Sequence, residues 1–336
     1  YHFFRQNFSQ VTNPPIDSLR ENKVMSLKTR FGNLGNILDF TNLIKENIYV
    51  LDSPILSNSQ LDKFINFFGQ NSKTIDCTFS KDENLDSAIE RIQRESEISA
   101  RQGLTQLVLS DKNISNERLP IPMLLSVGAV NTHLIKKKLR GYVSINAQTG
   151  EALDTHSFAT LIGVGATTVN PYLALDSLYQ RFEKKLFGKY GYDECIERFI
   201  QSVNYGLLKI MSKMGISVLS SYRGGCNFET VGLSRTIASE YFPGVISKIS
   251  GIGLNGIEKK LRIIHSQAFE ENNSVLPIGG LYRYRKNGET HQYQGKLMHL
   301  LQSSVGSNSF EGYKKYVDGI YNLPPIHLRD LIGFRE

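Results

Sequence analysis

Short runs rich in β-branched and aromatic residues alternate with helical patterns over most of the chain. Such runs, bounded by turn residues, predict strands, and they lie at Asn47–Leu51, Thr74–Phe79, Thr105–Ser110, Gly141–Asn146, Thr167–Tyr172, Ile216–Ser221 and Val245–Ser250. Apolar residues at helical spacing predict helices between them, at Leu85–Ile92, Leu124–Leu139 and Cys195–Met214. Several strands are apolar on both faces, which is typical of a sheet that helices cover on both sides.

The alternation of strand and helix predicts an α/β fold with a parallel sheet. A β/α-barrel-like domain of the TIM-barrel type, complete or incomplete, is the preferred architecture, and an open doubly wound sheet is the alternative. We expect residues 1–46 to form an irregular lead-in that packs on a neighbouring domain, and residues 47–256 to form the barrel-like domain. Residues 257–336 are predicted to be a connector, with a helix up to Phe269 and a short helix near Leu297–Ser304.

Composition and charge exclude several classes of protein. The 336 residues carry a net charge of +7, and 40% of them are hydrophobic, which is enough for a sizeable core and excludes a disordered chain. The three cysteines fit a reducing cytosol rather than a disulfide scaffold. No apolar run approaches the ~18 residues that a membrane helix needs. The tight basic run Lys136–Lys138, with Arg140, is typical of a solvated helix end rather than of a nucleic-acid site. The first residue is Tyr1 rather than Met, so we expect a fragment or a processed product.

Two glycine-rich segments are predicted to be turns. Gly251–Gly256 has the pattern G-x-G-x-x-G between a predicted strand and a predicted helix. The rest of a dinucleotide-binding βαβαβ unit does not follow it, so a tight strand-to-helix turn is favoured. Gly163–Ala166 stands at the end of a predicted helix, where glycine favours a C-terminal turn over a phosphate cradle.

The loop Ser221–Gly225 has the composition of an anion site. Gly224 and Gly225 permit close approach to backbone N–H groups, and Arg223 adds positive charge. β/α barrels often hold phosphate groups in the loops after their last strands. We expect Asn227 to cap the helix that follows. The competing interpretation is that the glycines only allow the chain to turn.

The residues alone predict no metal site, no cofactor site and no catalytic group. The histidines lack a paired metal-binding spacing, and the cysteines lie too far apart in the sequence for a metal site. Each cysteine is predicted to be a small buried hydrophobe. Asp154–Ser157 contains acid–base groups, but adjacency in sequence is not the geometry of a catalytic triad. Asp154 or Thr155 is instead predicted to be a helix N-cap.

Long unbroken motifs in this chain resemble a known family. They lie at Phe4–Glu21, Leu109–Asp111, Pro120–Pro122, Gly163–Ala174, Lys209–Ser217, Ser221–Gly225, Asn227–Glu229 and Val231–Ser234. In this order, and over nearly the whole chain, they are similar to the central domain of the glutamate synthase large subunit. The segment Gly279–Asp330 resembles the lead-in to the FMN-binding domain of that family.

The resemblance implies that the parent protein is a large flavoenzyme, an oxidoreductase. In that family, an amidotransferase domain releases ammonia from L-glutamine, and the ammonia crosses an internal tunnel to an FMN-bearing β/α barrel. There it combines with 2-oxoglutarate, and reduction gives L-glutamate, while a 3Fe–4S cluster relays electrons. The central domain resembles a degenerate copy of the FMN barrel, in agreement with the β/α pattern.

For this chain, the resemblance implies a structural and channelling part with no cofactor and no complete active site of its own. Thr12 and Asn13, in the loop Val11–Pro15, resemble residues near the tunnel mouth and are candidates to line it. The implied partners are the amidotransferase and FMN-binding domains of the same polypeptide and a small electron-donating subunit or ferredoxin, in the cytoplasm. Two alternatives stay open: a stand-alone β/α-barrel protein that binds a phosphorylated small molecule at Ser221–Gly225, and a purely structural interaction module.

Overall fold

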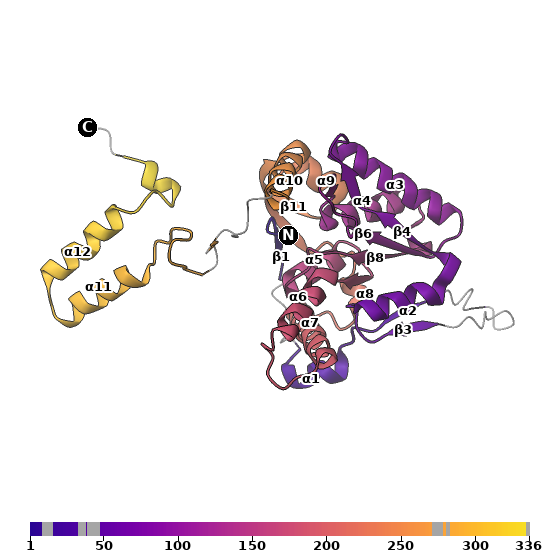
Figure 1. Ribbon diagram of the computed structural model, residues 1–336, viewed down its shortest axis with the longest axis horizontal. Helices are drawn as coiled ribbons and strands as arrows, with labels where there is room; N and C mark the ends of the chain where they lie inside the picture. The colour runs from indigo at the N-terminus through magenta and orange to yellow at the C-terminus, as the bar shows by residue number, and fades with distance from the viewer. Residues whose placement is uncertain (9–15, 33–37, 39–47, 271–277, 280–282, 334–336) are drawn as a thin grey trace. The chain divides into compact units, whose positions relative to one another are not determined.

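The computed structural model describes residues 1–8, 16–32, 38, 48–270, 278–279 and 283–333 (Figure 1). It consists of two compact units, Tyr1–Ala268 and Phe269–Glu336. The division falls after the predicted boundary at residue 256, because the helix α10 (Leu254–Ala268) packs on elements of the first unit.

A parallel four-stranded sheet forms the centre of the first unit. Its strands are β4 (Ser72–Asp76), β6 (Gln106–Ser110), β8 (Ser144–Gln148) and β9 (Thr168–Asn170), hydrogen-bonded in that order. The spatial order follows the chain without a reversal, as in a β/α barrel, whereas a doubly wound sheet reverses its order at a switch point. The α/β class is confirmed, and among the described residues the sheet stays open rather than closing into a barrel.

Helices connect the parallel strands as the sequence predicts. They are α3 (Leu85–Arg101), α4 (Met123–Lys136) and α5 (Thr155–Gly163). Asn84 caps α3 by accepting a hydrogen bond from the Ser87 N–H, and α4 packs directly on β6 and β8. The amphipathic helix α7 (Tyr192–Met214) packs on α5 and ends where Gly215 adopts a left-handed conformation with φ of 72°.

Predicted strands also lie outside the parallel sheet or only partly within it. The run Asn47–Leu51 gives β3 (Tyr49–Leu51), which pairs antiparallel with β2 (Thr29–Phe31). The run Thr74–Phe79 is divided between β4 and β5 (Thr78–Ser80), and β5 pairs antiparallel with β7 (Arg118–Pro120).

The prediction of a strand at Ile216–Ser221 is wrong. Val218 makes one isolated parallel bridge with Ser26, and the chain then turns into the short helix α8 (Leu219–Tyr222). Leu219 and Tyr222 are both fully buried, and a helical turn places residues three apart on the same face.

The helix predicted after Asn227 is a strand instead. Strand β10 (Phe228–Leu233) lies between β1 (Phe4–Gln6), to which it is antiparallel, and β11 (Ile246–Ile252), to which it is parallel. The Phe228 ring packs directly against Gly163, and a Cβ on Gly163 would lie only 2.4 Å from the ring. Burial of this ring therefore fixes the position of the strand. The helix α9 (Arg235–Tyr241) comes between β10 and β11.

Both glycine-rich turns are confirmed. Strand β11 passes into α10 through the G-x-G-x-x-G segment, and a Cβ on Gly251 would lie 2.0 Å from the Gly232 carbonyl oxygen. That glycine therefore serves the close approach of β10 and β11. The second segment ends α5, and Gly165 has φ of +130°.

The remaining helices of the first unit are α1 (Ser18–Val24), α2 (Asn58–Phe68) and α6 (Tyr172–Glu183). One large core packs on the face of the parallel sheet that carries Leu107, Leu109, Ile145 and Ala147, and a smaller aromatic core lies under β2, β3 and α2. In the second unit, the predicted short helix is α11 (Gly295–Gly306), which packs on α12 (Phe310–Tyr321), a helix that the sequence did not predict.

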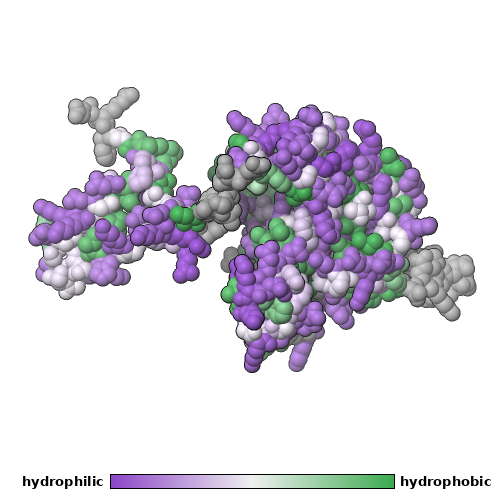
Figure 2. All heavy atoms as spheres, in the orientation of Figure 1, coloured by the Kyte–Doolittle hydropathy of each residue, from purple (hydrophilic) through white to green (hydrophobic). Residues whose placement is uncertain are grey.

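The described surface is mostly hydrophilic in the view of Figure 2, where hydrophobic side chains gather only in small groups. Among the described residues, every helix is too short or too polar to cross a bilayer.

Candidate functional site

The carboxyl ends of β6 and β8 bring together a buried acidic cluster. Asp111 follows β6 and is fully buried. Its carboxylate accepts hydrogen bonds from the Thr149 hydroxyl at 2.5 Å and from the Gly150 N–H at 3.1 Å, both in the loop after β8. Burial raises the pKa of Asp111 in spite of these bonds, and the Tyr172 hydroxyl at the start of α6 interacts with the same carboxylate.

Glu151 is the second carboxylate of this cluster. Its Oε2 accepts a hydrogen bond of 3.0 Å from the N–H of Met123, the first residue of α4, whose N-cap Pro122 offers no side-chain acceptor. Burial, followed by the negative charge of Asp111, raises the pKa of Glu151 to about 7. The cluster can therefore hold a proton near neutral pH, while each carboxylate also fixes a backbone segment.

The sequence did not indicate Glu151 as a site residue, and Asp111 and Tyr172 appeared only within family motifs, with Tyr172 also at the end of a predicted strand. The signal was available, because polar residues directly after parallel strands meet at the carboxyl edge, where β/α barrels place their active sites. Their contact depends on the register, in which Ser110 pairs with Gln148.

Other elements cover this carboxyl edge next to β4 and β6. The hairpin-like pair β5 and β7 extends beyond the sheet, and Arg118 on β7 binds Asp76 Oδ2 at 3.0 Å and the Thr78 hydroxyl at 2.8 Å. Helix α10 adds Glu258, which accepts from the Leu85 N–H at 3.0 Å. The space where a barrel enzyme would admit substrate is thus occupied by side chains and backbone.

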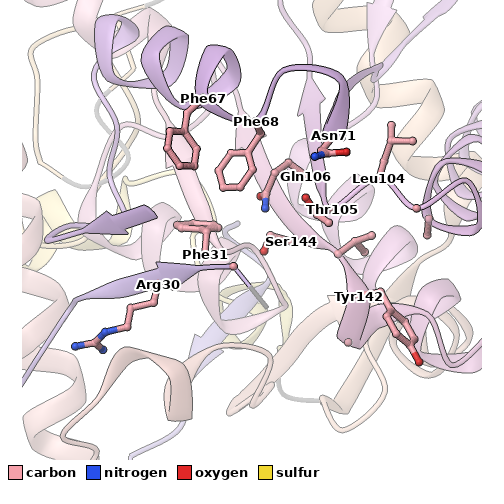
Figure 3. Close-up of a pocket in the computed structure, with 15 residues that line it drawn as sticks. Arg30, Phe31, Phe67, Phe68, Asn71, Leu104, Thr105, Gln106, Tyr142 and Ser144 are labelled. Atoms are coloured by element: carbon pink, nitrogen blue, oxygen red, sulfur yellow. The ribbon is translucent and has the colours of Figure 1, made fainter. Parts of the chain in front are cut away.

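The amino edge of the same sheet is open. A cavity of about 860 Å³ lies there, bounded by residues just before β4, β6 and β8 and by the ends of β2 and α2. Figure 3 shows the rings of Phe31, Phe67 and Phe68 grouped together beside Gln106 and Ser144. The aromatic wall of the cavity suits an apolar group, and the first residues of the strands offer polar atoms.

The loop predicted to bind an anion lies near this amino edge. The N–H groups of Gly224 and Gly225 donate to the carbonyls of Ile162 and Tyr222, at 3.1 and 3.2 Å. The backbone donors of the loop are therefore used internally, and the capacity for anion binding rests on the side chain of Arg223.

The tunnel candidates Thr12 and Asn13 lie outside the described residues. The predicted N-cap is confirmed, because Asp154 accepts from the Ser157 N–H at 2.8 Å at the start of α5. Cys77 is buried, which raises its pKa to about 12, and Cys195 is buried as well. Within the part of the chain that the structure describes, no cluster of three or more His, Cys, Asp or Glu side chains could hold a metal ion.

Comparison with known proteins decides the family. The family described as glutamate synthase central domain matches residues 1–234. The chain belongs to this family. The glutamate synthase [NADPH] large chain of Azospirillum brasilense is 49% identical over 339 residues, which cover 100% of this chain and 22% of that protein.

Other glutamate synthases align over similar lengths. The NADPH large chain of Bacillus subtilis is 37% identical over 99% of this chain and 22% of its own length. The ferredoxin-dependent enzyme of Spinacia oleracea is 36% identical over 100% of this chain and 22% of its own length. The chain thus spans about 22% of the length of these curated relatives.

Solved structures of flavocytochrome b2 also align with the domain. One variant gives a TM-score of 0.35 at 13% identity, over 59% of this chain and 47% of that chain. A similarity of this size carries no argument about ligands.

Proposed function

We propose that this chain is the central, inter-domain part of a glutamate synthase that makes L-glutamate from L-glutamine and 2-oxoglutarate. The observation that carries the proposal is the alignment of the whole chain with glutamate synthase large chains at up to 49% identity. The parent polypeptide would contain an amidotransferase domain and an FMN-binding domain, with FMN and a 3Fe–4S cluster outside this chain, and would act in the cytoplasm. Residues 257–336 would lead to the FMN-binding domain.

Within that enzyme, the role of the chain would be structural. The covered carboxyl edge supports this role, because Arg118, Glu258 and the β5–β7 pair fill the position where β/α barrels act on substrate. The buried carboxylates Asp111 and Glu151 support it too, since both are engaged in holding backbone N–H groups.

The proposal is tested with the full polypeptide. We expect glutamate to form from glutamine and 2-oxoglutarate when NADPH, NADH or reduced ferredoxin is supplied in separate assays. The purified protein should show a flavin absorbance band. Failure of all three donors to support glutamate formation, with flavin bound, would contradict the proposed activity.

The assignment of Thr12 and Asn13 to the tunnel wall rests on the resemblance alone. In the full polypeptide, Thr12→Trp should lower glutamine-dependent glutamate formation while glutamine hydrolysis persists. Thr12→Ser is the matched control and should retain both activities. Unchanged coupling in Thr12→Trp would exclude Thr12 from the tunnel wall.

A further inference from the structure

Two arginines converge at the end of α5, beside the amino edge of the parallel sheet. Arg140 Nη2 donates to the Gly165 carbonyl at 2.9 Å, and the loop that carries Arg223 is bonded to the same helix end through the Gly224 N–H and the Ile162 carbonyl. Burial and the nearby charge of Arg223 lower the pKa of Arg140 to about 10. Two positive charges thus share one poorly hydrated region.

The donors of these two arginines are used differently. Arg140 is well bonded, since its Nε donates to Asn131 Oδ1 at 2.7 Å and its Nη1 donates to the Val143 carbonyl at 2.5 Å. Arg223 donates from Nη2 to the Thr29 hydroxyl at 3.2 Å, while its Nε is buried without a hydrogen-bond partner. Leaving a buried donor unpaired is costly, so this Nε–H points to a missing acceptor.

Within the described residues, the charge of the pair also lacks a carboxylate partner. Burial lowers the pKa of Arg223, and no carboxylate among the described residues forms an ion pair with Arg140 or Arg223. Arg118 at the other edge provides the contrast, because it contacts Asp76 at 3.0 Å. Buried charges are normally paired, and two like charges in one place make an anion the simplest compensation.

We propose that Arg223, with Arg140 beside it, binds a small free oxyanion of the phosphate or carboxylate type at the amino edge. The Arg223 Nε–H would donate a hydrogen bond to one oxygen of the anion, since a guanidinium binds planar or tetrahedral oxyanions through neighbouring N–H donors. Arg140 contributes its charge while its own donors hold the chain before β8 and β9. The site replaces the glycine cradle predicted from the sequence, and it is independent of the proposed enzyme activity.

Hydrogen–deuterium exchange of the full polypeptide tests the site, because it reports locally in a large protein. Inorganic phosphate at 10 mM is compared with potassium chloride at equal ionic strength. For a dissociation constant near 1 mM, phosphate should slow exchange in peptides spanning residues 158–168 and 219–227 by about tenfold. Chloride should leave this exchange unchanged, Arg223→Met should abolish the effect of phosphate, and the control Arg118→Met should preserve it.

Four outcomes would overturn the proposal. Equal slowing by chloride, or an undiminished effect of phosphate in Arg223→Met, would mean general screening of charge. In a third outcome, exchange in the original protein is already slow without phosphate and does not respond to it, while Arg223→Met accelerates this exchange. That result would place an acidic side chain of the rest of the polypeptide against Arg223. No response to phosphate and no effect of Arg223→Met would mean that Arg223 needs no anion.

Discussion

The two edges of the parallel sheet differ in both charge and space. The carboxyl edge holds the buried carboxylate of Asp111 and the largely buried Glu151, and it is covered by β5, β7 and α10. The amino edge holds the arginines Arg140 and Arg223 and opens into a cavity of about 860 Å³. In β/α-barrel enzymes the carboxyl edge is the catalytic edge and the amino edge contributes stability. Here the edge that usually works on substrate is packed, and the opposite edge has both space and unpaired charge.

Removal of the Asp111 carboxylate should have the largest effect on the free energy of unfolding. Asp111→Ala leaves the Thr149 hydroxyl and the Gly150 N–H without their acceptor, and we expect it to lower the free energy of unfolding by about 3 to 4 kcal/mol. Asp111→Asn keeps one acceptor oxygen and should cost about 1 kcal/mol. Urea unfolding of both variants at pH 7 measures the difference. A loss under about 1 kcal/mol for Asp111→Ala would mean that the carboxyl edge does not depend on this residue.

The second carboxylate should make stability depend on pH. The pKa of Glu151 is raised to about 7 in the folded chain, above its value in the unfolded chain, so the folded state binds the proton more tightly. Stability from this group is therefore present at low pH and is lost as the pH rises from about 4.5 to about 7. Glu151→Gln mimics the protonated form and should be more stable than the original by about 3 kcal/mol above pH 7, and equal to it near pH 4.

Urea unfolding at several pH values between 4 and 8 gives this difference directly. Asp111→Asn serves as a second test, because removal of the neighbouring charge should shift the pH dependence to lower pH. A pH-independent difference between Glu151→Gln and the original would show that the pKa of Glu151 is the same in the folded and the unfolded chain.

These two carboxylates also show where sequence reasoning ends. The periodic helices α3, α4, α7 and α10 were predictable, since apolar spacing alone defines a buried helical face. For the acidic pair, the available signal was the position of each residue just after a parallel strand, while the contact between Asp111 and Glu151 depends on the register of β6 and β8.

The errors around Arg223 have the same origin. Strand β10 is fixed by burial of Phe228 against Gly163, which belongs to a distant part of the chain. The glycines at 224 and 225 correctly predicted a turn, but the carbonyls that take their N–H groups belong partly to α5. The sequence therefore indicated the charge of the site through Arg223. The interpretation of Arg140 as part of a solvated helix end is wrong, because its guanidinium is largely buried and bonded to Asn131 and Gly165.

At the amino edge, a substitution that displaces the partner of Arg140 should have an intermediate effect. Gly165 has φ of +130°, and a Cβ there would lie 2.5 Å from the Asn131 side chain that accepts from Arg140 Nε. We expect Gly165→Ala to cost about 2 kcal/mol, from backbone strain and the lost contact together. Gly103→Ala is the matched control, since φ is +87° there but no atom lies within 4 Å, and it should cost about 1 kcal/mol. Equal costs for the two variants would mean that the contact of Asn131 with Arg140 adds nothing.

The smallest effect comes from a pair of glycines that flank β8 and compare the two edges directly. Gly150 lies at the carboxyl end, and a Cβ on it would lie 3.1 Å from the Tyr172 hydroxyl, which is a tight contact. This hydroxyl interacts with Asp111. Gly141, at the amino end, lines the cavity, and no atom lies within 4 Å of a Cβ placed there. Gly150→Ala should therefore cost about 1 kcal/mol, because Tyr172 must move away from a buried carboxylate. Gly141→Ala should stay within about 0.5 kcal/mol of the original, because the new methyl group enters open space. Urea unfolding of the two variants side by side measures this contrast, and a cost at Gly141 that equals or exceeds the cost at Gly150 would show that the amino edge is packed as tightly as the carboxyl edge.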